Sequence, residues 1–202
     1  MHKFEEAINN SSALLLKKYF LTSINWQDVL NFLYEQSLIK NVKLEEKKDP
    51  KALVDVFGNI LIMQPLWLAP QTGKVWENFA EVKDFLIKLN KDCGNDPVFE
   101  ECSFYKHWDN RPCDCNSIWH SEGIKISLSD KRISEHSDPW HACYLQIIGE
   151  SFWKINGAES VTYKLEEGDL LFFPKNTSHE VWSEGPRAGM LVSADRKGIF
   201  NF

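Results

Sequence analysis

The sequence from Gly168 to Val181 reads GDLLFFPKNTSHEV. A Gly-Asp pair, which is typical of a turn, leads into the apolar run LLFF, and Pro174 ends that run. The polar segment PKNTS then separates the run from His179. The pattern predicts a short strand, a turn and a second strand, with His179 on the second strand.

More short strands are expected on both sides of this segment. Gly149-Glu150 marks a turn, and Asn156-Gly157 is a strong signal for a two-residue hairpin. Many short strands joined by tight turns indicate a sandwich or a barrel. The expected strands are residues 123–130, which alternate between apolar and polar positions, the apolar run 142–148, and residues 151–155, 160–165, 170–173 and 187–194.

The first ninety residues have a mixed pattern. Asn25 is a helix cap for residues 26–36, with Asp28 three residues later, and residues 78–90 repeat apolar side chains at helical spacing. Residues 52–63 predict two short strands around Gly58 and Asn59. The segment 107–121 is long and irregular, and such loops often carry function.

Composition and charge exclude some classes of protein. The 202 residues are 43% hydrophobic and 13% aromatic, which is enough to build a core without disulfide support. The net charge of −6 argues against a nucleic-acid binder and against an anionic membrane surface as partner. We see no membrane span and no signal peptide, and five cysteines without a regular framework suggest a reducing, cytoplasmic compartment.

Two histidines and one aspartate form the strongest chemical pattern. His136 and Asp138 stand two residues apart, so an extended strand would present both on one face. His179 follows 41 residues after Asp138, and a rolled-up sheet can return the chain to that point. Two imidazoles and one carboxylate leave three octahedral positions open, which is the arrangement of non-heme Fe(II) oxygenases.

These segments resemble the metal-binding motifs of a known group of enzymes. GDLLFFPKNTSHEV is similar to the second motif of the JmjC-like and cupin-like hydroxylases, and HSDPWHACYLQIIGESFWKI is similar to the first. The resemblance covers residues 120–195. It implies a mainly β fold, a cupin-type double-stranded β-helix or jelly roll with N-terminal helices. The domain would span residues 1–202, with a mixed part at 1–95 and the metal-binding β core at 98–195.

The resemblance also implies an activity. The protein would be a dioxygenase that uses Fe(II), 2-oxoglutarate and O2 to hydroxylate a C–H bond of a small molecule, an amino acid or a peptide side chain. His136, Asp138 and His179 would be its catalytic metal ligands.

The residue that would hold the far carboxylate of 2-oxoglutarate departs from the pattern. These families usually have Lys or Arg two residues after the turn glycine, where this chain has Ser151. Arg187 is a candidate substitute, since related oxygenases keep an arginine at about this offset from the second histidine, although a solvated charge at the strand edge is the alternative. Tyr144, Lys125 and Ser127 are further candidates for binding the co-substrate.

Other interpretations stay open. Ser151 favours a metal-dependent cupin dioxygenase or isomerase that does not use 2-oxoglutarate, and a non-enzymatic cupin-like binding protein is the third hypothesis. A zinc site is disfavoured by the C-x-C spacing. His141 would face away from the pocket on a regular strand, or toward it if the D-P-W turn bends the chain. Trp119 and His120 are candidates for a pocket rim. The helical N-terminal part could support a homodimer, and the sequence leaves the oligomeric state open. The four residues considered for zinc are Cys102, His107, Cys113 and Cys115.

Overall fold

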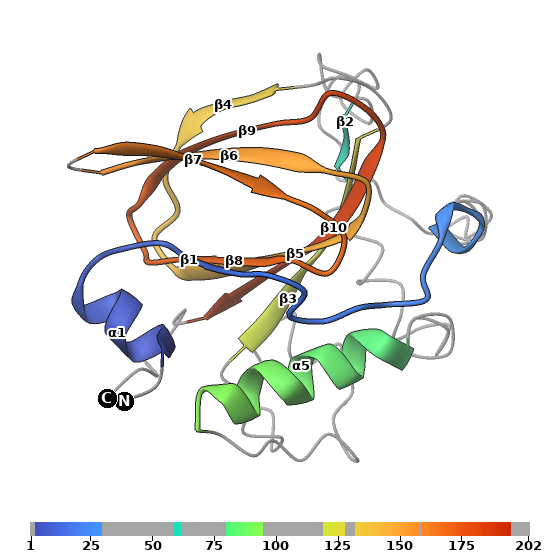
Figure 1. The fold of residues 1–202 in the computed structure, drawn as a ribbon, viewed down its shortest axis with the longest axis horizontal. Coiled ribbons are helices and arrows are strands. Elements are labelled where there is room, and N and C mark those ends of the chain that lie inside the picture. The colour runs from blue at the N-terminus through green and yellow to red at the C-terminus, as the bar shows by residue number, and fades with distance from the viewer. Residues whose placement is uncertain are drawn as a thin grey trace, which may run out of the picture.

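Two antiparallel β-sheets pack face to face in a computed structural model that describes residues 3–29, 59–61, 80–94, 119–127, 132–157 and 159–194 (Figure 1). The six-stranded sheet has the order β1-β8-β5-β10-β3-β2, and the four-stranded sheet has the order β4-β9-β6-β7. This arrangement confirms the predicted mainly β jelly roll. The strands are β1 (Leu14–Leu16), β2 (Asn59–Leu61), β3 (Trp119–Ser127), β4 (Arg132–His136), β5 (His141–Ile148), β6 (Ser151–Asn156), β7 (Ser160–Leu165), β8 (Leu170–Phe173), β9 (Ser178–Trp182) and β10 (Arg187–Ala194), and the helices are α1 (Lys3–Asn9) and α5 (Ala80–Asp92).

Most predicted elements lie where the sequence places them. The strands at residues 170–173 and 187–194 are confirmed, and Asn156-Gly157 connects β6 to β7 as a hairpin. The helix predicted at 78–90 starts and ends two residues later, and the strand predicted at 123–130 is longer at its start and ends at Ser127. Within the described ranges, none of the helices reaches the length and apolarity that a membrane crossing requires.

The cap at Asn25 is also confirmed. Its Oδ1 accepts hydrogen bonds from the backbone N–H groups of Gln27 (2.8 Å) and Asp28 (3.3 Å), and the Asp28 carboxylate accepts one from the Asn25 N–H (2.9 Å). Residues 26–29 are helical, and the rest of this predicted helix lies outside the described residues. The same is true of most of residues 52–63 and of the irregular loop up to residue 118.

The six-stranded sheet is covered on both faces. One face of β5 and β10 packs with α1 and α5, where Leu145 and Met190 join Phe85 and Leu89 in a core. The other face meets the four-stranded sheet, where Tyr144, Trp153, Phe173 and Val181 belong to a second core. All eight residues of β5 are buried for this reason, which explains the continuous apolar run in its sequence.

Gly189 on β10 provides the space for one of these interior side chains. A Cβ atom at this position would overlap the ring and hydroxyl of Tyr144. The missing side chain therefore lets the Tyr144 phenol lie across β10, toward the start of that strand.

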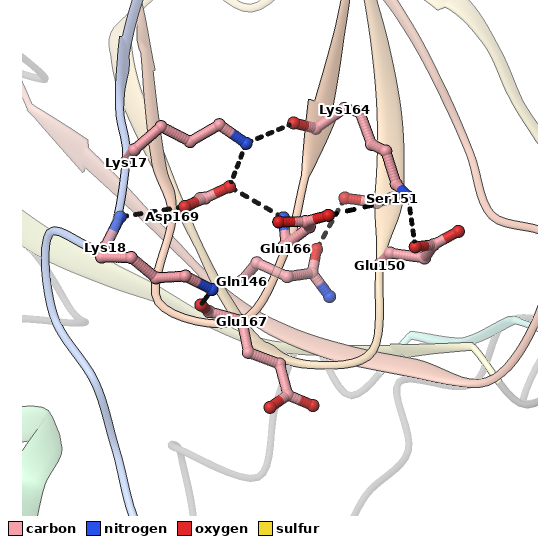
Figure 2. Close-up of polar contacts among 9 residues, drawn as sticks. All are labelled: Lys17, Lys18, Gln146, Glu150, Ser151, Lys164, Glu166, Glu167 and Asp169. Carbon is pink, nitrogen blue, oxygen red and sulfur yellow. Dashed lines mark hydrogen bonds and ion pairs between the residues drawn. The ribbon is translucent and has the colours of Figure 1, made fainter.

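The chain segment after β1 is attached to the turn before β8 (Figure 2). β1 pairs with β8, and the buried Asp169 carboxylate accepts hydrogen bonds from Lys17 Nζ (2.7 Å) and from the backbone N–H groups of Lys18 (2.9 Å) and Glu166 (2.9 Å). Burial alone would raise the pKa of Asp169, but these donors lower it below its usual value. Asp169 thus holds the N-terminal segment on the sheet edge and shapes the turn that begins β8.

We predict that Asp169→Ala lowers the free energy of unfolding by about 2–3 kcal/mol, because two part-buried backbone N–H groups lose a charged, buried acceptor. Urea denaturation followed by circular dichroism measures this. Glu166→Ala is the matched control, since it removes an exposed carboxylate from the same turn and should change stability by less than about 0.5 kcal/mol. Equal effects of the two substitutions would contradict the role given to Asp169.

Candidate metal centre

The three residues predicted to bind a metal lie close together, two of them on the paired strands β4 and β9. β4 and β9 pair with His136 directly opposite His179, and the two imidazole rings are 4.3 Å apart. Asp138 Oδ2 lies 3.9 Å from His179 Nε2. One ligand atom from each residue can be chosen so that all three lie within 4.8 Å of one another, so they could hold one ion.

Asp138 reaches this site differently from what the sequence predicted. β4 ends at His136, so alternation along one strand does not place the carboxylate beside the imidazole. The Asp138 carbonyl instead accepts a hydrogen bond from the backbone N–H of Asn176 (2.6 Å), in the turn between β8 and β9. The turn that precedes His179 therefore also fixes the segment that carries Asp138.

Both histidines are oriented by the same local contact. His136 Nδ1 lies 2.8 Å from the Ser134 carbonyl oxygen, and His179 Nδ1 lies 2.9 Å from the Thr177 carbonyl oxygen. A carbonyl oxygen can only accept, so each Nδ1 carries the proton and each Nε2 keeps its lone pair. This is the arrangement in which the backbone prepares a histidine to bind a metal through Nε2.

The site runs from solvent to the interior. His136 is exposed, Asp138 is half-buried and His179 is buried. Burial lowers the pKa of His179, and the nearby His136 adds to this effect, while the Thr177 carbonyl and Asp138 oppose it. The lowered pKa of His179 favours its neutral form, which is the form that binds a metal.

Aromatic rings form the floor below His179. The Phe173 ring is 4.6 Å from the imidazole, and the Trp153 ring stacks on it at 5.8 Å with an interplanar angle of 23°. Tyr144 packs against Trp153 at 4.7 Å. These large side chains exclude water from the inner side of the site.

Arg187 is buried beyond this floor. It is 3% exposed, and one of its terminal nitrogens donates a hydrogen bond to the Tyr144 hydroxyl (3.0 Å). Its Nε has no hydrogen-bond partner within the described residues. The alternative of a solvated charge at the strand edge is therefore wrong, and the structure instead has a buried guanidinium facing the interior.

The other predicted co-substrate residues have different surroundings. The Ser151 hydroxyl donates to Gln146 Oε1 (2.6 Å) and accepts from Trp153 Nε1 (3.0 Å), so its single proton is already in use. Ser127 is buried opposite Arg187 in the β3–β10 register. Lys125 lies opposite Gly189 in the same register, and its side chain is outside the described part of the chain.

His141 and Trp119, which were considered for other roles, both lie in the core beneath the helices. His141 is buried on the opposite face of β5, where its ring stacks on Phe172, so it faces away from the metal centre as expected. Trp119 is not a pocket rim, because it is fully buried in the core beneath the helices and donates to Cys93 Sγ (3.4 Å). The His120 side chain and the four residues considered for zinc lie outside the described residues.

Trp153 and Phe173 are the site residues that sequence reasoning did not assign. Ser151, Trp153 and Ile155 alternate along β6, so all three were predictable as neighbours on one face. What the sequence does not give is which face of β6 meets the histidines, because that depends on pairing with β9.

Comparison with known proteins agrees with the β core. The model of a family described as the AraC-like ligand binding domain matches residues 119–195. Comparison with curated protein sequences finds no match.

Parts of three solved structures are similar to about a third of this chain. YcfD, a ribosomal oxygenase from Escherichia coli, is 22% identical over 35% of this chain and 21% of its own, with a TM-score of 0.33. A cupin superfamily protein from Desulfitobacterium hafniense is 17% identical over 35% of this chain and 62% of its own (TM-score 0.32). The DMSP lyase DddQ from Ruegeria pomeroyi is 17% identical over 37% and 38% (TM-score 0.34). This chain thus matches about a fifth of YcfD, and none of these likenesses assigns an activity to it.

We predict that His179→Ala abolishes binding of Fe(II) or Co(II) but leaves the fold intact, because the two cores contain many other buried side chains. Calorimetric titration of the metal and far-UV circular dichroism test the two parts. His141→Ala is the matched control, since it removes a buried histidine from the other face of β5 and should retain metal binding. Global unfolding of His179→Ala, or unchanged metal affinity, would contradict the assignment.

Proposed function

We propose that this protein is an Fe(II)- and 2-oxoglutarate-dependent dioxygenase that hydroxylates a C–H bond of a small molecule, an amino acid or a peptide side chain. The observation that carries the proposal is the convergence of His136, Asp138 and His179, which offer three ligand atoms within 4.8 Å of one another. The resemblance of their two sequence motifs to those of JmjC-like and cupin-like hydroxylases supports the choice of co-substrate.

The donor set fits Fe(II). Two imidazole nitrogens and one carboxylate are the protein ligands of non-heme Fe(II) oxygenases, and they leave positions for a co-substrate and O2. Both Nε2 atoms are available because each Nδ1 is bonded to a backbone carbonyl. The bound iron would supply the oxidising chemistry, and the protein's own groups would orient the reactants around it.

Arg187 fits the far carboxylate of 2-oxoglutarate. A buried guanidinium without a carboxylate partner among the described residues is costly, and a bound anion would offset that cost. The Tyr144 hydroxyl lies beside it and is a second group for the same carboxylate. Arg187 therefore replaces the lysine or arginine that the resembled families have at the position of Ser151.

Aromatic rings shield the site from water on its inner side, while its other side is exposed to solvent. Phe173, Trp153 and Tyr144 keep water from the inner side of the site. The lower local dielectric would strengthen the interaction of Arg187 with a bound carboxylate and that of Asp138 with a bound ion. The exposed His136 marks the side from which a substrate would approach. A cytoplasmic setting, a homodimer and the absence of nucleic-acid and membrane partners are also part of the proposal.

The second candidate is a metal-dependent cupin enzyme that does not use 2-oxoglutarate. It is favoured by Ser151, whose proton is donated to Gln146 and is not available to a carboxylate. The aromatic side chains between the histidines and Arg187 also favour a smaller ligand on the metal.

Anaerobic titration of the Fe(II)-loaded protein with 2-oxoglutarate separates the two candidates. Chelation of the iron should give a weak visible charge-transfer band that saturates. We predict that Arg187→Ala raises the half-saturating concentration at least about tenfold, because a charge-assisted hydrogen bond contributes about 1.5–3 kcal/mol. Arg187→Lys should be intermediate, since it retains the charge but not the planar fork.

Arg132→Ala is the matched control for this titration, because Arg132 is exposed and pairs with Glu180 (2.6 Å) on the outer side of the four-stranded sheet. It should leave the titration unchanged. Bound iron without any band would support the metal-dependent cupin that does not use 2-oxoglutarate. Similar effects of Arg187→Ala and Arg132→Ala would mean that another residue binds the carboxylate.

A further inference from the structure

A buried chain of hydrogen bonds links Gln146, Ser151 and Trp153. The Ser151 hydroxyl donates to Gln146 Oε1 (2.6 Å) and accepts from Trp153 Nε1 (3.0 Å). Gln146 and Ser151 are fully buried, and Trp153 is 4% exposed. Figure 2 shows the Ser151 side chain directed at the Gln146 amide, away from the ion pair that Lys164 forms with Glu150.

The direction of these bonds is fixed by Gln146. Its Nε2 donates to the carbonyl oxygens of Ile148 (2.8 Å) and Ala188 (3.4 Å), so its Oε1 faces Ser151. Its backbone N–H and C=O are bonded to Asp169 and Gly168 in the turn before β8. An amide oxygen can only accept, so the one Ser151 proton goes to Gln146 and the hydroxyl oxygen is left to accept from the indole.

Trp153 connects these hydrogen bonds to the metal centre, because it bonds to Ser151 and stacks on His179. Trp153 and Ile155 lie on the same face of β6, and Ile155 is directly opposite His179 on β9. The indole ring stacks on the His179 imidazole at 5.8 Å and 23°, while Tyr144 and Phe173 contact it at 4.7 Å and 5.5 Å. Its N–H is held by Ser151, so the ring has a fixed tilt against the histidine.

We propose that Ser151 is a positioning residue of the metal centre, which acts through Trp153 to hold the His179 ring in the orientation that binds the ion. The inference rests on the metal site of the proposed function. It also explains why Ser151 departs from the pattern of the resembled families. Those families have a lysine or arginine at this position to bind the co-substrate, whereas here the residue would support the metal ligand His179.

The alternative role of Ser151, as a co-substrate anchor, does not fit the geometry. A carboxylate needs a donor, and the only Ser151 proton is committed to a buried amide oxygen. Breaking that bond would leave the Gln146 oxygen unsatisfied in a fully buried position. Arg187, which has an unpartnered buried Nε within the described residues, requires no such loss.

Besides its ring neighbours, His179 is oriented by the hydrogen bond from Nδ1 to the Thr177 carbonyl. That bond restrains rotation of the ring about its Cβ–Cγ bond from the Nδ1 edge alone. Contact with the indole face restricts this rotation. Loss of the support should therefore weaken the metal without abolishing its binding.

The test uses Ser151→Ala, Ser151→Thr, Trp153→Phe and the Ser151→Ala/Trp153→Phe double variant in the full chain. Co(II) affinity is measured by calorimetry and ligand geometry by the visible d–d spectrum. We expect Ser151→Ala to weaken Co(II) binding by about tenfold, the lower end of effects seen when support to a metal ligand is removed, and to alter the spectrum. Ser151→Thr keeps the hydroxyl and should restore both within about twofold, a smaller change than loss of that support.

The double variant separates a positioning role from an additive one. If Ser151 acts through Trp153, Ser151→Ala should change affinity less than twofold in the Trp153→Phe background, as expected for coupled neighbours. Ser160→Ala is the matched control, because Ser160 Oγ also donates to an amide oxygen, that of Asn156 (2.8 Å), but on the exposed side of the same sheet. It should leave affinity and spectrum unchanged.

A measurement on the metal-free protein tests the support of His179 by Ser151 independently of metal binding. The NMR resonance of the His179 Cε1–H group reports the ring's position under Trp153, and it should move in Ser151→Ala and return in Ser151→Thr. Wild-type affinity, spectrum and apo resonance in Ser151→Ala, even with a lower unfolding midpoint, would overturn the positioning role. Failure of the wild type to bind Co(II), with the resonance shift present, would overturn the metal site but retain the support of His179 by Ser151.

Discussion

The antiparallel register of β4 against β9 is the constraint on which the metal centre depends. It places His136 opposite His179, and pairing of β9 with β6 places Ile155 on the other side of His179. A slip of one residue would turn His179 to the outer face, because side chains alternate along a strand. Two features specify this register. Val181 and Trp153 are buried in one core on the inner face of the sheet, and the Asn176 N–H donates a hydrogen bond to the Asp138 carbonyl.

The two faces of the six-stranded sheet differ in the polarity of their buried side chains. The face under α1 and α5 is an apolar core that includes Leu145, Met190 and Phe172. The inner face carries buried polar groups that a purely structural core does not need, above all Arg187 with its unpartnered Nε within the described residues. Buried polar groups are costly unless they are bonded, so their presence on one face indicates where a ligand is expected.

Much of this arrangement was predictable from the sequence because the decisive signals are local. The runs LLFF and RAGMLVSA and the Asn156-Gly157 turn each identify an element without any knowledge of its neighbours. The H-x-D motif indicates candidate ligands only together with the strand-turn-strand spacing and the segment that ends at His179. The contacts of Ser151 and Trp119 were not predictable in the same way. Each depends on which residue of a distant strand lies opposite, and a strand as short as β1 gains its structure from pairing with β8 rather than from its own three leucines. The tight link from Asn176 to Asp138 likewise joins two segments that no local pattern connects.

The most direct test of the metal centre is X-ray absorption spectroscopy of the Fe(II)-loaded protein, which counts imidazole ligands through multiple scattering from their rings. Binding of one iron by both His136 and His179 predicts two imidazoles per iron, with oxygen donors completing the shell. A shell without imidazoles, with only one, or with sulfur donors would contradict it, because His136 and His179 would then not bind the metal together.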